Sequence, residues 1–350
     1  MDNVRFILFV FLIFFGVILF QQWEVDYGPK PDVAAQEASD PVITGETVAP
    51  ATDVPSSARG SLDDVAGSRL ALSAAAAHQL VRVVTDVVTL ELDTRGGDIR
   101  DMQLTQYPVS KDRPDEPVHL MSEKELFFVA QSGFLGDEKV APNHHSLWHA
   151  AATEYQMAPG ENTLRVPLTW ISPEGVTVTK TYVLRRGEYR IGLEQTVTNH
   201  AATVWKARQY VQLQRKDPGD KAKDAFIRTY TGGVIYTAEE NYKKIEFKEM
   251  EDNKERTSKT GWSAMIQHYF LAAWIPSSDV DNTFYTKALS EQHFVIGSYS
   301  SPAEVAANET RTFTAELFAG PKLQRVLEQT APGLELTVDY GSLTIVAKPI

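Results

Sequence analysis

Apolar and polar residues alternate with a period of two along most of this 350-residue chain from residue 80 onward. Successive side chains of a strand point to opposite faces of a sheet, so the alternation predicts half-buried strands. In VVTLELD, for example, Val88, Leu90 and Leu92 share one face, and Gly96-Gly97 then predicts a turn into the next strand. This pattern restricts the chain to a fold built from β-sheets.

A second hairpin is predicted by VTVTKTYVL from Val176, which alternates up to a turn at Arg185-Arg186-Gly187. Further strands of the same kind are expected in FFVAQSGF at Phe127, NTLRVPLTW at Asn162, VWKARQYVQLQ at Val204, HYFLAAWI at His268, NTFYTKAL at Asn282, HFVIGSY at His293 and TRTFTAELFAG at Thr310. So many strands in about 240 residues predict one large antiparallel β-sandwich.

One soluble helix is predicted after these strands. Pro321 would lie in its first turn, Leu323, Val326 and Leu327 would form one apolar stripe, and Pro332-Gly333 would end it.

The N-terminus contains an apolar run, FILFVFLIFFGVILF, from Phe6 to Phe20. The segment from Val4 to Trp23 would be about 30 Å long as a helix, which matches the hydrocarbon thickness of a bilayer. A cleaved signal peptide is the alternative, but no small-x-small site follows closely. We therefore expect one uncleaved membrane anchor that includes Phe6, Leu12, Phe20 and Trp23.

The charges around this anchor indicate its orientation. Arg5 and the α-amino group precede it, whereas Glu24 and Asp26 follow it. Positive charge favours the cytoplasmic side, so the N-terminus is expected inside and the rest of the chain outside.

Four segments are thus predicted: an anchor over residues 1–27, a flexible linker over 28–78, the β-sandwich over 79–320, and a C-terminal helix with its following residues over 321–350. The linker is rich in Pro, Ala, Ser, Thr, Asp and Gly and has no sustained periodicity. Within it, SRLALSAAAAHQL is compatible with a short helix or with none.

Composition excludes several classes of function. The formal net charge of -12 disfavours nucleic acid, because a phosphate backbone would be repelled. The chain has 0 cysteines, which excludes disulfides, cysteine nucleophiles and thiolate metal sites.

Motifs that could carry chemistry are few. His144-His145 could suggest a metal site, but in an extended segment the two side chains would point to opposite faces, and no carboxylate follows at ligand spacing. Gly232-Gly233 lacks a following helix with lysine and is interpreted as a turn. The alternating charges from Lys243 to Lys259 indicate a solvated face. We expect no catalytic residue, no metal and no cofactor.

The aromatic residues allow two interpretations. They could line a sugar-binding platform, although aromatic side chains on alternating strands more often belong to the core or to cross-strand pairs. The tryptophans concerned are Trp170, Trp205, Trp262 and Trp274.

Several segments resemble the Gram-negative membrane protein insertase YidC family, in the same order along nearly the whole chain. They are TDVVTLELDTRGGDI (Thr85 to Ile99), YVLRRGEY (Tyr182 to Tyr189), TGGVIYTAEENYKKIEF (Thr231 to Phe247), GWSAMIQHYFLAAWIP (Gly261 to Pro276) and GLELTVDYG (Gly333 to Gly341). Ser342-Leu343-Thr344 departs from the bulkier aromatic residues that the family tends to place after its Tyr-Gly.

The resemblance implies a bacterial inner-membrane protein whose periplasmic domain is a β-supersandwich similar to galactose mutarotases. In this family five further membrane helices insert and fold client membrane proteins, so Ile350 is not expected to be the natural end. The family also contacts the Sec translocon, including SecD and SecF. This implies a partner surface around Tyr230, Tyr236, Tyr242 and Phe247. A periplasmic scaffold and a carbohydrate-binding, mutarotase-like module are the alternative functions.

Overall fold

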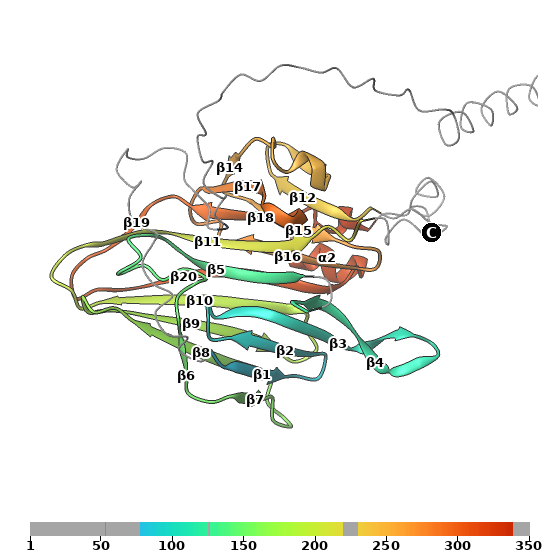
Figure 1. Ribbon diagram of the computed structural model, residues 1–350, viewed down its shortest axis with the longest axis horizontal. Helices are drawn as coiled ribbons and strands as arrows, with labels where there is room; N and C mark the ends of the chain where they lie inside the picture. The colour runs from blue at the N-terminus through green and yellow to red at the C-terminus, as the bar shows by residue number, and fades with distance from the viewer. Residues whose placement is uncertain (1–52, 54–77, 125–126, 220–229, 339–350) are drawn as a thin grey trace, which may run out of the picture. The chain divides into compact units, whose positions relative to one another are not determined.

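The computed structural model describes residues 53, 78–124, 127–219 and 230–338 of the chain. All of them belong to one compact unit, Pro50–Ile350. Two β-sheets make up most of this unit (Figure 1). The predicted mainly β class is therefore confirmed.

The larger sheet has eleven strands in the order β14-β17-β18-β11-β5-β4-β3-β2-β1-β7, with β19 paired to β11. β1 pairs antiparallel with β2 and parallel with the short β7. The strands are β1 (Leu80–Val84), β2 (Val88–Asp93), β3 (Asp98–Ser110), β4 (Arg113–Ser122), β5 (Phe128–Gly136), β7 (Glu154–Gln156), β11 (Trp205–Lys216), β14 (Arg256–Ser258), β17 (Asn282–Ala288), β18 (His293–Ser300) and β19 (Ala303–Val305).

The smaller sheet has nine strands in the order β13-β12-β15-β16-β20-β10-β9-β8-β6. Its long central ladders, β10 with β9 and β10 with β20, are antiparallel. The strands are β6 (His149–Ala150), β8 (Thr163–Ile171), β9 (Val176–Arg185), β10 (Arg190–Asn199), β12 (Gly232–Thr237), β13 (Asn241–Ile245), β15 (Gly261–Ile266), β16 (Phe270–Pro276) and β20 (Thr310–Pro321).

The main hydrophobic core contains buried side chains from both sheets, such as Leu90 of the larger sheet and Leu193 of the smaller one. The alternation in the sequence produces this core, because every second side chain of a strand points to the same face. Trp205, Trp262 and Trp274 are buried in the core, so the core interpretation of these three tryptophans is confirmed.

Both predicted hairpins are present. β2 pairs with β3 across Gly96 and Gly97, whose φ angles of 82° and 62° explain why the turn uses glycine. β9 pairs with β10 across the turn that contains Gly187.

Gly232-Gly233 was wrongly interpreted as a turn. Both glycines belong to β12. A Cβ on Gly233 would lie 2.5 Å from Cε of Met250 and 3.0 Å from Cδ1 of Ile296, so a side chain here would require Met250 to shift.

The predicted C-terminal helix exists but begins later than expected. Pro321 is the last residue of β20, and α2 runs from Gln324 to Thr330 (Figure 1). Leu327 is fully buried, whereas Leu323 precedes the helix and is exposed, so the predicted stripe is shorter. Three short 3₁₀ helices complete the described structure: η2 (Phe247–Glu249), η3 (Ser290–Gln292) and η4 (Leu334–Thr337).

The predicted anchor residues Phe6, Leu12, Phe20 and Trp23 lie outside the described residues, as does most of the predicted linker. Within the described part of the chain, no helix has the length and apolar character required to cross a bilayer.

Candidate functional site

The outer face of the larger sheet carries polar and aromatic side chains at positions that alternate with core residues. On β11, Val211 and Leu213 belong to the main core, whereas Tyr210 belongs to a separate cluster with Tyr285. Gln212 lies between the two core residues and therefore points to the same outer face as Tyr210. This face combines hydrogen-bonding groups with aromatic rings.

Hydrogen bonds fix the orientation of Gln212 on this face. Tyr285 Oη donates to Gln212 Oε1 over 2.6 Å. Gln212 Nε2 donates to Gln131 Oε1 over 2.8 Å and to the backbone oxygen of Asp53 over 3.1 Å. Gln131 and Gln212 are buried, so these bonds satisfy groups that water does not reach.

His144 and His145 lie beside this face in a turn between β5 and β6. The expectation of an extended segment was wrong. Asn143 Oδ1 accepts the backbone N–H of His145 over 2.8 Å, and the backbone oxygen of Asn143 accepts the N–H of Ser146 over 3.1 Å. Asparagine side chains stabilise turns in this way. The turn brings the two imidazole centroids to 4.2 Å from each other.

The carboxylate of Asp53 lies against both rings. Its Oδ1 is 2.9 Å from His145 Nε2, and its Oδ2 is 3.1 Å from His144 Nε2. Burial raises the pKa of the Asp53 carboxyl, but its close contacts with both imidazoles outweigh this and hold the pKa well below its usual range. The hydrogen bond between Asp53 and His145 raises the pKa of His145. Asp53 is therefore ionised in this arrangement.

Tyr210 determines the position of His144. Its Oη is 2.6 Å from His144 Nδ1 and accepts the backbone N–H of His144 over 3.0 Å. Burial raises the pKa of the Tyr210 hydroxyl, so it stays protonated. His144 itself is only 1% exposed.

Sequence reasoning missed Asp53, which precedes His145 by 92 residues. No spacing rule connects residues this far apart. Asp53 also lies in the low-complexity stretch that was expected to be a flexible linker, so only the fold shows that it meets the histidines.

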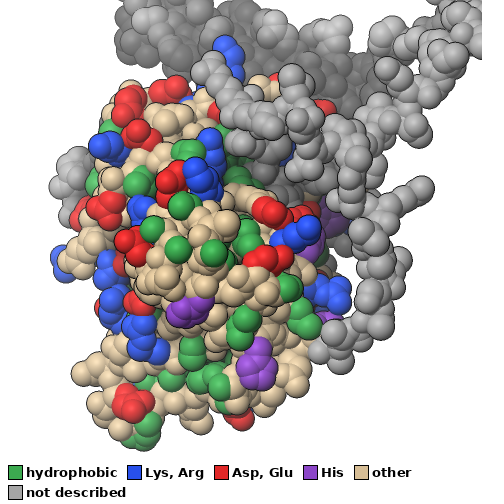
Figure 2. Space-filling model, turned by 90° about the vertical axis from the view of Figure 1, so that its left-hand side faces the viewer, with side chains coloured by type: hydrophobic (Ala, Val, Ile, Leu, Met, Phe, Trp, Pro, Cys, Tyr) green, Lys and Arg blue, Asp and Glu red, His purple; other side chains and the backbone are tan. Residues whose placement is uncertain are grey.

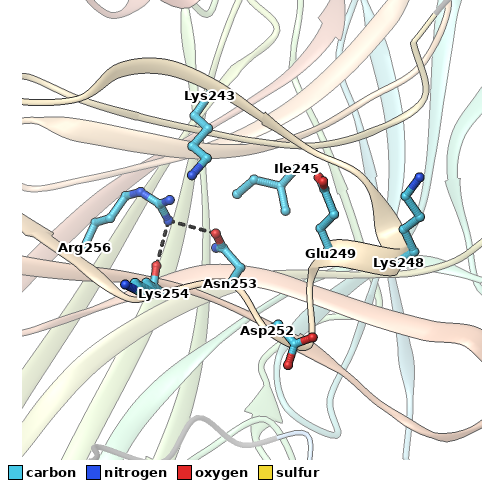
Figure 3. A pocket seen from close by; sticks show the side chains of 8 residues that line it. All are labelled: Lys243, Ile245, Lys248, Glu249, Asp252, Asn253, Lys254 and Arg256. Atoms are coloured by element: carbon cyan, nitrogen blue, oxygen red, sulfur yellow. Dashed lines mark hydrogen bonds between the residues drawn. The ribbon is translucent and has the colours of Figure 1, made fainter.

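A second feature is a cleft of about 690 Å³ beside β13, η2 and β14 (Figure 3). It is lined by Lys243, Ile245, Lys248, Glu249, Asp252, Asn253, Lys254 and Arg256. Arg256 donates to Asn253 Oδ1 over 3.1 Å and to the backbone oxygen of Lys254 over 2.7 Å. The mixed charges agree with the predicted solvated face, although Ile245, Phe247 and Met250 of the same stretch are buried.

The four residues predicted as a partner surface lie close to this cleft. The ring of Tyr236 stacks on Trp262 at 5.6 Å, and Tyr242 contacts the same tryptophan edge-on at 6.1 Å. The hydroxyl of Tyr230 accepts the backbone N–H of Ile245 over 3.0 Å. Phe247 is buried against Phe294.

The structure thus brings the four residues together, on and beside β12 and β13, and their rings contribute mainly to packing. Whether this surface binds a partner stays a prediction. On the face shown in Figure 2, acidic and basic side chains are interspersed, without one dominant sign of charge.

Fold and site together define a two-sheet β domain whose polar outer sheet face contacts a residue from the preceding low-complexity segment. The chain belongs to the YidC periplasmic domain family, whose sequence profile matches residues 80–350. The resemblance deduced from the sequence is thereby confirmed.

Two relatives named as membrane protein insertase YidC align along the whole chain. The protein from Methylococcus capsulatus is 54% identical, and the one from Thioalkalivibrio sulfidiphilus is 39% identical. The alignments cover 100% of this chain but 63% and 64% of the two relatives. The chain therefore spans slightly less than two thirds of their length.

Solved structures with a similar fold include a galactose mutarotase related enzyme from Lactobacillus acidophilus, at 7% identity and a TM-score of 0.46. A galactose mutarotase-like protein from Lactobacillus casei has 8% identity and the same TM-score. Each covers 69% of this chain, and the matches extend over 97% and 99% of those proteins. At these values the similarity says nothing about activity.

Proposed function

We propose that this chain is the anchor and periplasmic portion of an inner-membrane insertase and chaperone. The complete protein would insert, fold and assemble integral membrane proteins, alone or with the Sec translocon. The observation that carries this proposal is the family match over residues 80–350, supported by relatives named as insertases that align along the full chain.

The proposed arrangement follows the four predicted segments. Residues 1–27 cross the membrane with the N-terminus in the cytoplasm, and 28–78 link the anchor to the β domain. Residues 79–320 form the periplasmic sandwich, and 321–350 lead towards the membrane-embedded remainder of the complete protein. The apolar run and the position of Arg5 before it support this orientation. Protease added to spheroplasts should digest the β domain while a cytoplasmic marker stays intact, and protection of both would contradict it.

The insertion step itself is assigned to the remainder of the complete protein. An unsatisfied backbone polar group in lipid costs several kcal/mol, so an insertase must shelter the polar groups of its client within the bilayer. A single apolar helix offers no such shelter. We therefore assign this portion a positioning and docking role, with no catalytic residue.

A chimera tests the proposal. In the protein from Methylococcus capsulatus, the aligned region is replaced by residues 1–350 of this chain, and the chimera is expressed in cells depleted of their own insertase. Insertion of a reporter membrane protein should be restored. A matched chimera with an unrelated β-sandwich should restore it less well. A chimera that accumulates normally without restoring insertion would overturn the proposal.

The Sec translocon, including SecD and SecF, is the proposed partner of the surface around Tyr230, Tyr236, Tyr242 and Phe247. The adjoining cleft exposes Lys248, which reaches solvent and pairs with Glu246 over 2.8 Å. A photo-crosslinking residue at Lys248 should capture a translocon subunit. The same residue at Lys206, an exposed position on β11, serves as the matched control. Equal capture from both positions would argue against this surface.

A further inference from the structure

We propose that Asp53, His144 and His145 form a three-ligand site for a divalent transition metal ion of the zinc type, with the fourth position left to water. Each residue offers one ligand atom, and the three atoms lie within 4.8 Å of one another. Among the described residues, this is the one group of three such side chains that converges in this way.

The donor set fits this class of metal. One carboxylate oxygen and two imidazole nitrogens are ligands that Zn²⁺ accepts, and three protein ligands with one open position are typical of its non-structural sites. Because the chain has 0 cysteines, the histidines are its best nitrogen or sulfur donors for such an ion.

The three ligand atoms lie near the spacing of a tetrahedral site. Ligand bonds of about 2.0–2.1 Å place two ligand atoms about 3.3 Å apart. In the structure Oδ1 of Asp53 lies 2.9 Å from His145 and Oδ2 lies 3.1 Å from His144, and one ligand atom from each residue lies within 4.8 Å of the other two. A movement of at most about 1.5 Å would bring the three atoms to tetrahedral spacing.

The Nε2 atom of His144 is the independent observation that points to a ligand. This atom is buried and makes no hydrogen bond of acceptable geometry, although Asp53 Oδ2 lies only 3.1 Å away. Buried polar atoms are nearly always satisfied, so an orphaned nitrogen requires an explanation. A metal ion bound to its lone pair would provide one.

The other ring nitrogen of His144 is prepared for this role. Metal-bound histidines usually donate their second ring N–H to an oxygen, which fixes the tautomer and the orientation of the ring. Tyr210 Oη lies 2.6 Å from His144 Nδ1 and can accept that N–H. The buried tyrosine thus serves as the outer partner of the ligand.

The other two ligands are also held by neighbours. Gln212 Nε2 donates to the backbone oxygen of Asp53, and the Asn143 turn fixes the backbone of His145. The site is therefore organised before an ion arrives. An ion there would hold Asp53 against the two histidines beside the outer face of the larger sheet.

The competing explanation is a metal-free contact in which the Asp53 carboxylate is shared by two imidazoles. Zinc binding distinguishes the two. The full 350-residue chain in detergent is titrated with Zn²⁺ against a chromophoric chelator, and bound zinc is counted after dialysis. One ion per chain is expected, and Co²⁺ in its place should show the visible absorption of tetrahedral coordination.

Variants locate the ion. Asp53→Asn and His145→Gln should abolish stoichiometric binding, and both residues are accessible enough for the fold to tolerate the change. Tyr210→Phe should weaken zinc affinity about 10- to 100-fold, because it removes the oxygen that orients His144. His119→Gln is the matched control, since His119 contacts a single carboxylate, Asp101, at 3.1 Å.

Zinc should also raise the melting temperature of the wild-type chain and of His119→Gln but not that of Asp53→Asn. Circular dichroism of each variant checks that the fold is retained. The proposal is overturned if the folded wild-type chain binds no stoichiometric zinc, or if binding survives unchanged in both Asp53→Asn and His145→Gln.

Discussion

Lys180 should be among the most sensitive positions of the fold, and Lys180→Met tests this. Its side chain is fully buried on β9 of the smaller sheet. Nζ donates to the backbone oxygens of Gly96 over 2.6 Å and Ser132 over 2.9 Å, both of which belong to the larger-sheet side of the sandwich. The carboxylate of Asp98, also fully buried, lies 3.9 Å away. One lysine therefore links the two sheets.

The expected cost of Lys180→Met is about 3 kcal/mol, at the lower end of the range for breaking a buried ion pair, because Arg100 still lies 3.5 Å from the Asp98 carboxylate. Methionine retains most of the apolar stem, so little of this cost comes from a cavity. Two carbonyl oxygens also lose a charged donor, a bond that typically contributes about 1.5–3 kcal/mol. Burying the charged Lys180 side chain costs free energy in the wild-type chain. This cost is absent in Lys180→Met, which offsets part of the loss of stability.

Asp98→Asn in the Lys180→Met background should recover part of the stability, because both buried charges are then absent. Arg165→Met on the neighbouring strand β8 is the control. Arg165 pairs with Glu194 at the surface, and exposed pairs contribute about 0–1 kcal/mol.

The difference in folding stability between the wild-type chain and Lys180→Met should depend on pH. Burial lowers the pKa of Lys180 to about 8, against 10.5 for an ordinary lysine. Between these two values the unfolded chain binds more protons than the folded one, so stability rises with pH. The wild-type chain should therefore gain stability relative to Lys180→Met as the pH increases through this window.

The assay is urea unfolding of the full chain, followed by tryptophan fluorescence. Far-UV circular dichroism is the second probe, since Trp148 lies 4.8 Å from Lys180 Nζ and its emission will change with the substitution. The reasoning is refuted if Lys180→Met costs no more than Arg165→Met, or if the effects of Lys180→Met and Asp98→Asn simply add.

Three further predictions concern packing and activity. Gly297→Ala should cost about 1–3 kcal/mol, because its Cβ would lie 2.4 Å from the backbone oxygen of Val211, whereas Gly192→Ala meets its nearest atom at 3.4 Å and should cost less in the same urea assay. Leu90→Ala in the core should lower the stability by about 2–5 kcal/mol, measured by thermal unfolding. Ile171, which is 68% exposed, is the control, and Ile171→Ala should cost less than about 0.5 kcal/mol in the same assay. In polarimetry with glucose or galactose, the chain should not accelerate mutarotation beyond the spontaneous rate, since the His144 ring is buried and held by Tyr210. Acceleration that is lost in a His145 variant would contradict this.

The parts of the fold that the sequence predicted are those set by local chemistry. The hairpin at Gly96-Gly97 needs only two glycines between alternating strands, and the hairpin from Val176 needs only its alternation and a turn. Both signals lie within about 25 residues, so no tertiary information was required.

The errors arose where distant residues decide the local structure. Gly233 lies in a strand because β12 pairs with β13 on one side and with β15 on the other, and a turn rule does not include such pairing. Pro321 extends β20 because that strand pairs with β16 up to Phe270, and this pairing delays the helix. Gly-Gly pairs do favour turns on average, and proline does favour the first turn of a helix. At these two positions, tertiary contacts overrode those preferences.

The outer face of the larger sheet could not be predicted from local sequence patterns for the same reason, since contacts between distant residues determine it. On β11, Gln212 alternates with Val211 and Leu213, a pattern that ordinarily indicates a strand with one side in water. Yet Gln212 is fully buried, and its amide is satisfied by Gln131, Tyr285 and the backbone of Asp53. A buried amide tolerates few arrangements of its partners, because any unmade hydrogen bond there costs about 1–3 kcal/mol. The sequence pattern thus assigns Gln212 to solvent, but in the structure its buried amide determines where Asp53 binds. The position of Asp53 in turn determines whether the two histidines contact a carboxylate.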